Sequence, residues 1–254
     1  MDTEYYRVAD MRTRMRSVGH SVILVVAAFV VGTLLYTMVG SLFQSAGYEV
    51  TALETLPPLP YAVLTATQFV GFFAVVAFYV QFESGGDLFD VGRPTLRDVG
   101  WVVGGLVGLF VVAAVVSTAF RYAGVDTATN QVIADGRQDP TRFLYLLPVT
   151  FLFVAPAEEL LYRGLIQGLF RRAYGVVPGI LLASVFFGAP HYFAMLGPGD
   201  TKLPAVVLVT ILGVLLGTLY ELTENLAVPV LVHALWNSFS FLSQYAEVTG
   251  LLTV

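Results

Sequence analysis

Long apolar runs separated by short polar segments make up most of the chain. A helix that crosses the hydrocarbon core of a membrane needs about 20 mainly apolar residues. Reading the chain for such runs predicts spanning helices at about 21–43, 59–82, 99–120, 143–170, 177–196, 204–222 and 226–243. An eighth crossing requires the long fourth run to be divided in two. The pattern therefore predicts an all-α, polytopic transmembrane bundle of seven or eight helices.

Composition indicates that these runs face lipid. Apolar residues make up 57% of the chain and charged residues 12%, and the mean hydropathy is +0.77. Soluble domains carry about a quarter charged residues, so this composition excludes an ordinary globular enzyme and a disordered chain. A net charge of −5 offers no polybasic patch and excludes a nucleic-acid partner. We expect residues 1–254 to form one integral membrane domain whose surroundings are the lipid bilayer.

The positions of the arginines predict an orientation. Positive residues flank the cytoplasmic ends of spanning helices. Those that precede the first run, or fall on the same side under a seven-span count, are Arg7, Arg12, Arg14, Arg16, Arg93, Arg97, Arg171 and Arg172. Residues 1–20 are therefore expected to be a cytoplasmic N-terminal segment of a multi-pass cell-membrane protein. Glycines at four-residue spacing also predict close helix packing: Gly100, Gly104 and Gly108, then Gly164 and Gly168, then Gly213 and Gly217.

Ionisable side chains concentrate in the later predicted spans. At membrane depth each costs roughly 2.5–3.5 kcal/mol on insertion scales, so each marks a functional site by default. The fourth run holds Glu158, Glu159 and Arg163, and the last two are an i,i+4 pair that neutralises one carboxylate. The fifth run holds His191. The seventh holds His233 and, one helical turn later, Asn237.

These side chains have the chemistry needed to hydrolyse an amide without serine or cysteine. A carboxylate and an imidazole, such as Glu158 and His191, can hold and deprotonate a water. A second imidazole and a carboxamide, His233 and Asn237, can stabilise a developing oxyanion. The chain has no cysteine, which excludes thiolate nucleophiles and cysteine zinc sites.

The same residues allow other interpretations. Glu158, His191 and His233 would make a His₂Glu zinc set with one position left for water, although no HExxH helix is present. Non-enzymatic alternatives are a membrane immunity or partner protein that keeps the cluster for packing, and a proton-coupled transporter. An enzyme needs the four candidate residues around one water-accessible cavity, whereas a transporter needs polar residues that continue to both membrane faces.

Three segments together resemble the motifs of a known family. They are Glu158-Glu159-x-x-x-Arg163, Phe187-x-x-x-His191 and His233-x-x-x-Asn237. In order and spacing they are similar to the motifs of the CPBP family of intramembrane endopeptidases, which comprises the type II CAAX prenyl proteases and the bacteriocin-processing or Abi proteins. The resemblance covers about 143–243, and the first three spans match only in being hydrophobic.

The resemblance implies an intramembrane protease with its catalytic core at 143–243. Its substrate would be a membrane-associated or lipid-modified, CAAX-like protein or peptide. Glu158 would activate water with help from His191, and His233 with Asn237 would form the oxyanion hole. The supporting residues would be Glu159, Arg163 and Phe187. The resemblance sets neither the metal requirement nor the physiological substrate, and the oligomeric state stays open.

Overall fold

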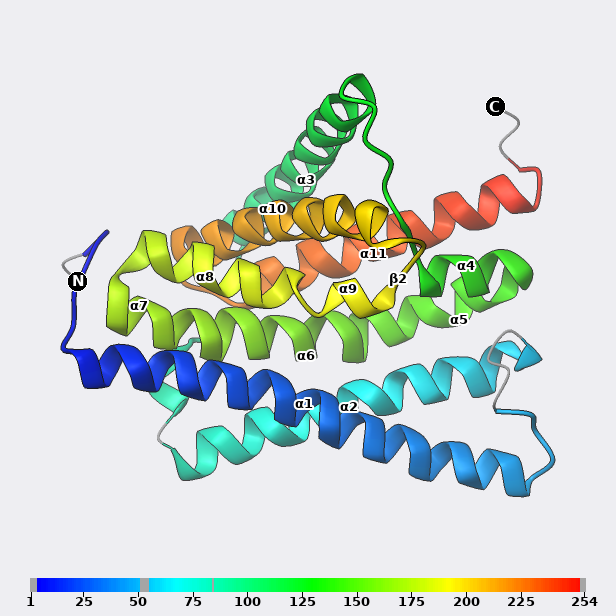
Figure 1. The fold of residues 1–254 in the computed structure, drawn as a ribbon, viewed down its shortest axis with the longest axis horizontal. Helices are drawn as coiled ribbons and strands as arrows, with labels where there is room; N and C mark the ends of the chain where they lie inside the picture. Colours follow the sequence, from blue (N-terminus) through cyan, green and yellow to red (C-terminus); the bar gives the residue numbers. More distant parts are fainter. Residues whose placement is uncertain (1–3, 51–54, 84, 252–254) are drawn as a thin grey trace.

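The computed structural model describes residues 4–50, 55–83 and 85–251, and most of them are helical (Figure 1). The long outer helices are α1 (Met11–Ser45), α2 (Pro58–Phe82) and α3 (Leu96–Tyr122), with the 3₁₀ turn η2 (Gly85–Leu88) after α2. Helix α4 (Gln131–Gln138) is short. The later helices are α8 (Val176–Gly188), α9 (His191–Ala194), α10 (Gly199–Thr223) and α11 (Ala227–Val248). The all-α prediction is confirmed, apart from a small two-stranded sheet.

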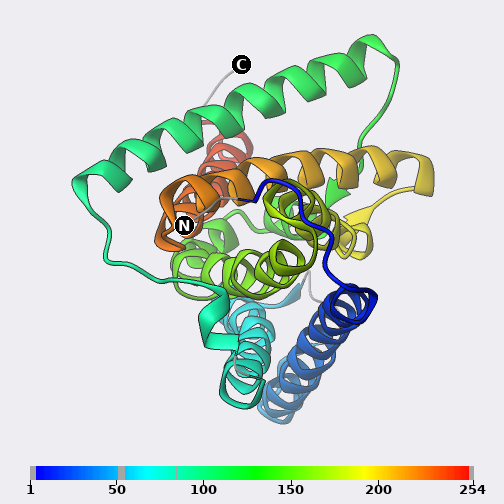
Figure 2. The same cartoon turned by 90° about the vertical axis from the view of Figure 1, so that its left-hand side faces the viewer.

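The central element is one continuous helical segment, Thr141–Tyr174. Its consecutive parts are α5 (Thr141–Val149), the π-helical turns η3 (Thr150–Val154), α6 (Ala155–Glu159), the π-helical turns η4 (Leu160–Gln167) and α7 (Gly168–Tyr174). Helices α1 and α2 pack on one side of this segment, and α8, α10 and α11 pack on the other (Figures 1 and 2). Helix α3 lies outermost, against α10 and α11 (Figure 2).

Six helices of the described residues are long and apolar enough to cross a membrane, and they correspond to the first six predicted runs. The predicted seven or eight spans are not confirmed. The fourth run is a single helix, so it supplies no eighth crossing. The seventh run forms α11, which is not among the six, because polar side chains such as His233, Asn237 and Ser238 dilute its apolar surface.

Glycines set the closest helix approach on each side of the bundle. A Cβ atom on Gly71 of α2 would overlap the backbone of Gly32 in α1. On the other side, a Cβ on Gly105 of α3 would lie 2.6 Å from Leu219 Cδ1 of α10. The predicted seam on α3 is therefore partly wrong: Gly100 and Gly104 have no neighbour within 4 Å of an added Cβ. The helix turns a different face, with Gly105 and Gly108, to its neighbours.

The two ends of the bundle differ in structure. We call the end at the start of α1 and the turn between α7 and α8 the arginine end; it lies at the left of Figure 1. We call the opposite end the strand end, because β1 (Thr129–Asn130) pairs there with β2 (Met195–Leu196) in antiparallel register. This sheet was not predicted, since two-residue strands leave no periodic pattern in the sequence.

The contact between α1 and α2 gives a direct test of this packing. Replacing Gly71 by alanine should force the two helices apart and cost about 1–3 kcal/mol of stability, as overpacking does. Gly104→Ala is the matched control, because the added methyl meets open space and alanine favours a helix. We expect a lowered thermal midpoint in detergent for the first variant only. Equal midpoints for the two variants would contradict the close approach.

Candidate active site

The helix that carries the first motif is widened on both sides of its two glutamates. Pro156 has no backbone N–H and so cannot donate to the carbonyl four residues earlier. The π-helical turns of η3 and η4 lie directly before and after α6, which carries Glu158 and Glu159. Such π-helical turns occur frequently at functional sites. The local winding presents two adjacent glutamates to the same neighbouring helix.

Glu159 lies at the centre of a buried hydrogen-bond cluster. Its Oε1 atom accepts from Arg163 Nη1 at 3.2 Å and from His233 Nδ1 at 2.8 Å. The side chains of Glu159 and Arg163 are 0% and 1% exposed. Arg163 also donates from Nη2 to the carbonyl of Gly213 at 3.1 Å. The Glu159 carboxylate thereby holds the Arg163 guanidinium on its own helix and the His233 imidazole on α11.

Glu158 approaches the other nitrogen of the same imidazole. Its Oε2 lies 3.6 Å from His233 Nε2, and its side chain is 12% exposed. Since His233 Nδ1–H donates to Glu159, the Nε2 side of the ring is the side available to Glu158 and to a ligand. The two glutamates therefore differ in environment: Glu159 is enclosed, whereas Glu158 borders a cavity.

His191 is held by the carbonyl of Phe187, one turn earlier. The carbonyl oxygen accepts from His191 Nδ1–H at 2.8 Å, which leaves Nε2 as the proton-accepting nitrogen of the ring. The Phe187 ring lies 4.9 Å from the His191 ring and 5.8 Å from the His233 ring, centre to centre. The Arg163 guanidinium carbon lies 4.2 Å from the centre of the same phenyl ring. Phe187 thus packs between the three motifs.

One cavity of about 390 Å³ brings the four candidate catalytic residues together. Glu158, His191, His233 and Asn237 all line it. Most of the remaining wall is apolar, and it includes Phe69, Phe72, Trp236 and Phe241. Polar groups in an apolar, concave site interact strongly with a bound ligand, because the local dielectric constant is low. Of the supporting residues, Phe187 lines the cavity, while Glu159 and Arg163 lie behind the wall.

Two contributors to the site were not predicted for this role. The carbonyl of Gly213 accepts from Arg163, and a Cβ on Gly213 would lie 3.2 Å from Arg163 Nη2 and 3.1 Å from the Phe187 ring. The four-residue glycine spacing was the available signal, but it indicated only helix packing. The second is the backbone carbonyl of Phe187, which carries no signal in the sequence because any residue supplies one.

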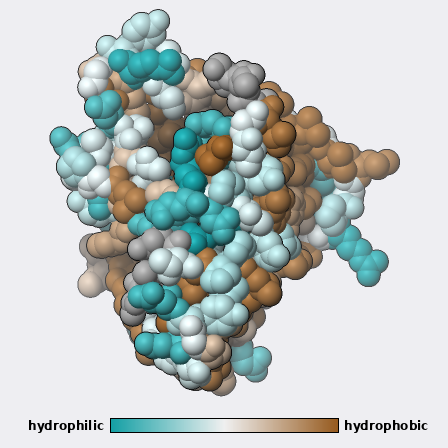
Figure 3. Space-filling model, turned by 90° about the vertical axis from the view of Figure 1, so that its right-hand side faces the viewer, coloured by the Kyte–Doolittle hydropathy of each residue, from teal (hydrophilic) through white to brown (hydrophobic). Residues whose placement is uncertain are grey.

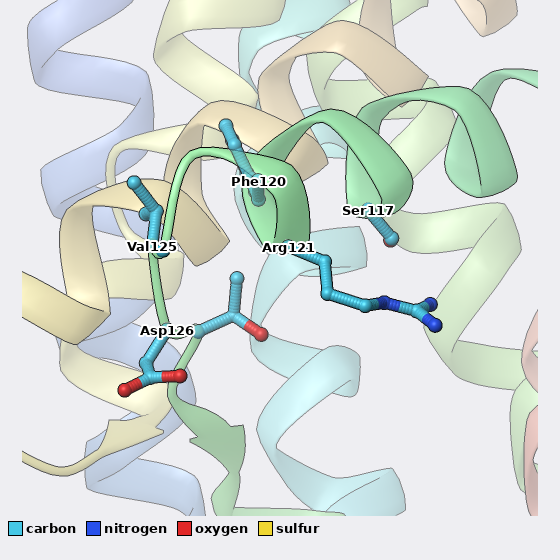
Figure 4. Close-up of a pocket in the computed structure, with 7 residues that line it drawn as sticks. Ser117, Phe120, Arg121, Val125 and Asp126 are labelled. Atoms are coloured by element: carbon cyan, nitrogen blue, oxygen red, sulfur yellow. The ribbon is translucent and has the colours of Figure 1, made fainter.

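A separate hollow of about 490 Å³ lies at the end of α3, away from these residues. Ser117, Phe120, Arg121 and Asp126 are among its lining residues (Figure 4). The Arg121 side chain extends away from Asp126 in this view (Figure 4). The hollow contains neither histidine nor glutamate, so it lacks the groups on which the candidate site is built.

The possible metal ligands of the described residues are histidine, aspartate and glutamate side chains. No group of three histidine, aspartate or glutamate side chains within them is arranged to hold a metal ion. Glu158, His191 and His233 share the cavity, and the His233 bond to Glu159 through Nδ1 leaves Nε2 on the cavity side, so this bond does not itself exclude a metal. The residues as arranged do not fit the His₂Glu zinc set, and no step below depends on a metal.

These features describe a helical integral membrane protein with a concave, mostly apolar site that holds a few polar side chains. A family model for the type II CAAX prenyl endopeptidase Rce1-like proteins matches residues 140–239, from α5 into α11. This part of the chain is similar to the Rce1-like domain, which is consistent with a CPBP-family intramembrane protease. No curated protein and no solved structure matches the chain.

The different environments of the two glutamates can be tested by stability. Glu159→Gln leaves the Arg163 guanidinium buried without its carboxylate, which should cost about 3–5 kcal/mol. Glu158→Gln alters a side chain that borders the cavity and should change stability far less. We expect a strongly lowered thermal midpoint in detergent only for Glu159→Gln. A larger loss for Glu158→Gln would reverse the two structural roles.

Proposed function

We propose that the chain is an intramembrane endopeptidase that hydrolyses a peptide bond with a water activated by Glu158 and His191. Its substrate is a membrane-associated or lipid-modified, CAAX-like protein or peptide. The observation that carries the proposal is the single cavity lined by Glu158, His191, His233 and Asn237. The match to the type II CAAX prenyl endopeptidase family supports the same reaction class.

The first step is attack of water on the scissile carbonyl carbon. Glu158 takes a proton from the water as its oxygen forms a bond to that carbon. His191 assists by accepting a hydrogen bond from the water at Nε2, which is free because Nδ1–H is bound to Phe187. The apolar wall strengthens these interactions by keeping the local dielectric constant low.

The second step is collapse of the tetrahedral intermediate. Its oxyanion accepts hydrogen bonds from His233 and from the Asn237 carboxamide, which lie one helical turn apart on α11. The carbon–nitrogen bond then breaks, and Glu158 returns the proton to the leaving nitrogen. Glu159 is a positioning residue: its bond to Nδ1 orients the His233 ring so that Nε2 faces the cavity.

The apolar part of the cavity supports a substrate that presents apolar groups. Phe29, Phe69 and Phe72 of α1 and α2 line it on the side away from α11. A lipid-modified or hydrophobic segment would lose apolar surface to this wall on binding, which favours association by about 25 cal/mol per Å². The non-catalytic alternatives, a membrane immunity or partner protein and a proton-coupled transporter, are not favoured by the family match.

Purified variants reconstituted with a quenched-fluorescence peptide library test the assignment of roles. Glu158→Gln and His191→Ala should each lower cleavage by at least about 10²-fold, the usual loss for a general base. Asn237→Ala should cost about 10²–10³-fold by removing an oxyanion donor. The matched controls are Glu83→Gln and His20→Gln, which change the same residue types at positions outside the cavity. Full activity in Glu158→Gln would remove that residue from the mechanism.

The same assay tests whether cleavage requires a bound metal ion. Because the mechanism above uses only side chains, cleavage should persist after treatment with a strong chelator and exhaustive dialysis. The measurement is the cleavage rate before chelation, after chelation, and after adding back zinc. Loss of activity that zinc restores would contradict the glutamate mechanism and favour a metalloprotease.

A further inference from the structure

A hollow of about 250 Å³ lies at the arginine end, where the chain enters α3. Arg93 and Arg97 line it, as does Trp101, one turn further along α3. We call it the Trp101 pocket. In Figure 2 the arginine end faces the viewer, and the connection from η2 to α3 runs along the left side of the bundle. Of the described residues that line the pocket, none is a candidate catalytic residue, so the pocket is separate from the candidate active site.

The buried side chain of Asn225 holds the walls of this pocket together. Its Oδ1 atom accepts from the backbone N–H of Gly92 at 3.0 Å and from that of Ala227 at 3.1 Å. Its Nδ2 atom donates to Asp98 Oδ2 at 3.3 Å. A Cβ on Gly92 would lie 3.2 Å from the Asn225 side chain, so glycine permits this close approach. Hydrogen bonds therefore join the loop before α3, the first turn of α3 and the turn between α10 and α11.

The charges that line the pocket are mainly positive. Arg93 and Arg97 are exposed, and neither forms a hydrogen bond or an ion pair with another described residue. One carboxylate, that of Asp98, also lines the pocket, and its Oδ2 atom accepts from Thr95 N at 2.7 Å and from Thr95 Oγ1 at 2.8 Å. Two guanidiniums against one carboxylate leave a positive charge in excess. Because the planar donor fork of arginine matches the oxygens of a phosphate, the pocket is complementary to a phosphate group.

The pocket lies where a spanning helix meets the membrane surface. Helix α3 is a candidate membrane-spanning helix, and the pocket surrounds its first turn. Arginine and tryptophan are typical of this interface. At the opposite, strand end of the bundle, hydrophilic side chains gather in the middle of the face and hydrophobic ones dominate one flank, as expected for helices that run across a bilayer (Figure 3). Beyond the pocket, α3 presents Val99, Val103 and Val107, each more than half exposed. A phosphate in the pocket would therefore lie above an apolar surface.

From this geometry we propose that the Trp101 pocket binds the headgroup phosphate of an anionic phospholipid from the surrounding bilayer. Arg93 and Arg97 donate hydrogen bonds to the phosphate oxygens, and Trp101 packs beside the glycerol part of the lipid. An acyl chain lies along the exposed valines of α3. Basic pockets between spanning helices bind anionic headgroups in this way. The proposal adds a ligand site to the protein and does not depend on the proposed peptide-bond hydrolysis.

Tryptophan fluorescence gives a direct measurement of this contact. The chain has two tryptophans, so Trp236→Phe leaves Trp101 as the only one, and a brominated lipid beside it quenches its fluorescence. This variant is reconstituted in mixed vesicles of phosphatidylglycerol and phosphatidylcholine, with bromine on one lipid or the other. We expect a preference of at least about fivefold for phosphatidylglycerol, which one arginine near an anionic headgroup would contribute. Equal quenching by the two lipids would overturn the proposal.

A matched pair of double variants separates the pocket from general surface charge. In the Trp236→Phe background, Arg93→Gln with Arg97→Gln should abolish the preference for phosphatidylglycerol. The control is Arg12→Gln with Arg16→Gln, which removes the same charge from two exposed arginines at the same end and spacing, outside the pocket. The control should keep the preference. Equal loss in the two double variants, or a preference retained without Arg93 and Arg97, would contradict the assigned site.

Inorganic phosphate distinguishes a lipid headgroup from a dissolved anion. Added to the same vesicles, with ionic strength matched by chloride in a parallel sample, it should leave the quenching by brominated phosphatidylglycerol unchanged. The reason is that the bilayer holds headgroups beside the pocket at a high local concentration. Release of the quenching by phosphate, but not by chloride, would show a site for a free anion and overturn the lipid assignment. None of these measurements requires cleavage, so they stand even if the proposed hydrolysis fails.

Discussion

The site depends on one buried carboxylate, that of Glu159. A bare charge at this depth would cost several kcal/mol, so the carboxylate persists only with compensating partners. Arg163 on the same helix and His233 on α11 both donate to its Oε1 atom. Because this single oxygen joins two segments distant in sequence, the charge balance of the fold and the orientation of the imidazole depend on the same contact.

The packing around this contact leaves the second glutamate exposed to the cavity. Gly213 allows Arg163 to reach a backbone carbonyl, and Phe187 covers the guanidinium from the other side. These contacts hold the cation beside Glu159 and away from the cavity wall. Glu158 instead faces His233, with 3.6 Å between its Oε2 and the His233 Nε2. The two adjacent glutamates thus have different positions: Glu159 is enclosed by protein, whereas Glu158 faces the cavity.

The features that follow from local spacing could be predicted from the sequence. The pairing of Glu159 with Arg163 requires only a helix, since residues four apart share a face. Local spacing alone could not predict that the three motifs meet in one site, because His191 and His233 lie on different helices. That prediction depended on the family resemblance. The carbonyls of Phe187 and Gly213 could not be predicted at all, since backbone acceptors are identical at every position. The face that α3 turns to its neighbours also could not be predicted, because the four-residue spacing favours the face of Gly100 and Gly104, whereas the packed face holds Gly105 and Gly108.

The seventh predicted run, α11, is not among the six candidate membrane helices for a physical reason that also bears on the site. Hydropathy treats each helix as though lipid surrounded it, but α11 packs against α3, α5 and α10 and can carry polar residues on its enclosed face. His233, Asn237 and Ser238 lower its hydropathy for that reason. A helix of this kind is tolerated at membrane depth only where protein or water satisfies its polar groups. Two of the side chains that weaken the membrane signal of α11, His233 and Asn237, are therefore also side chains that line the cavity.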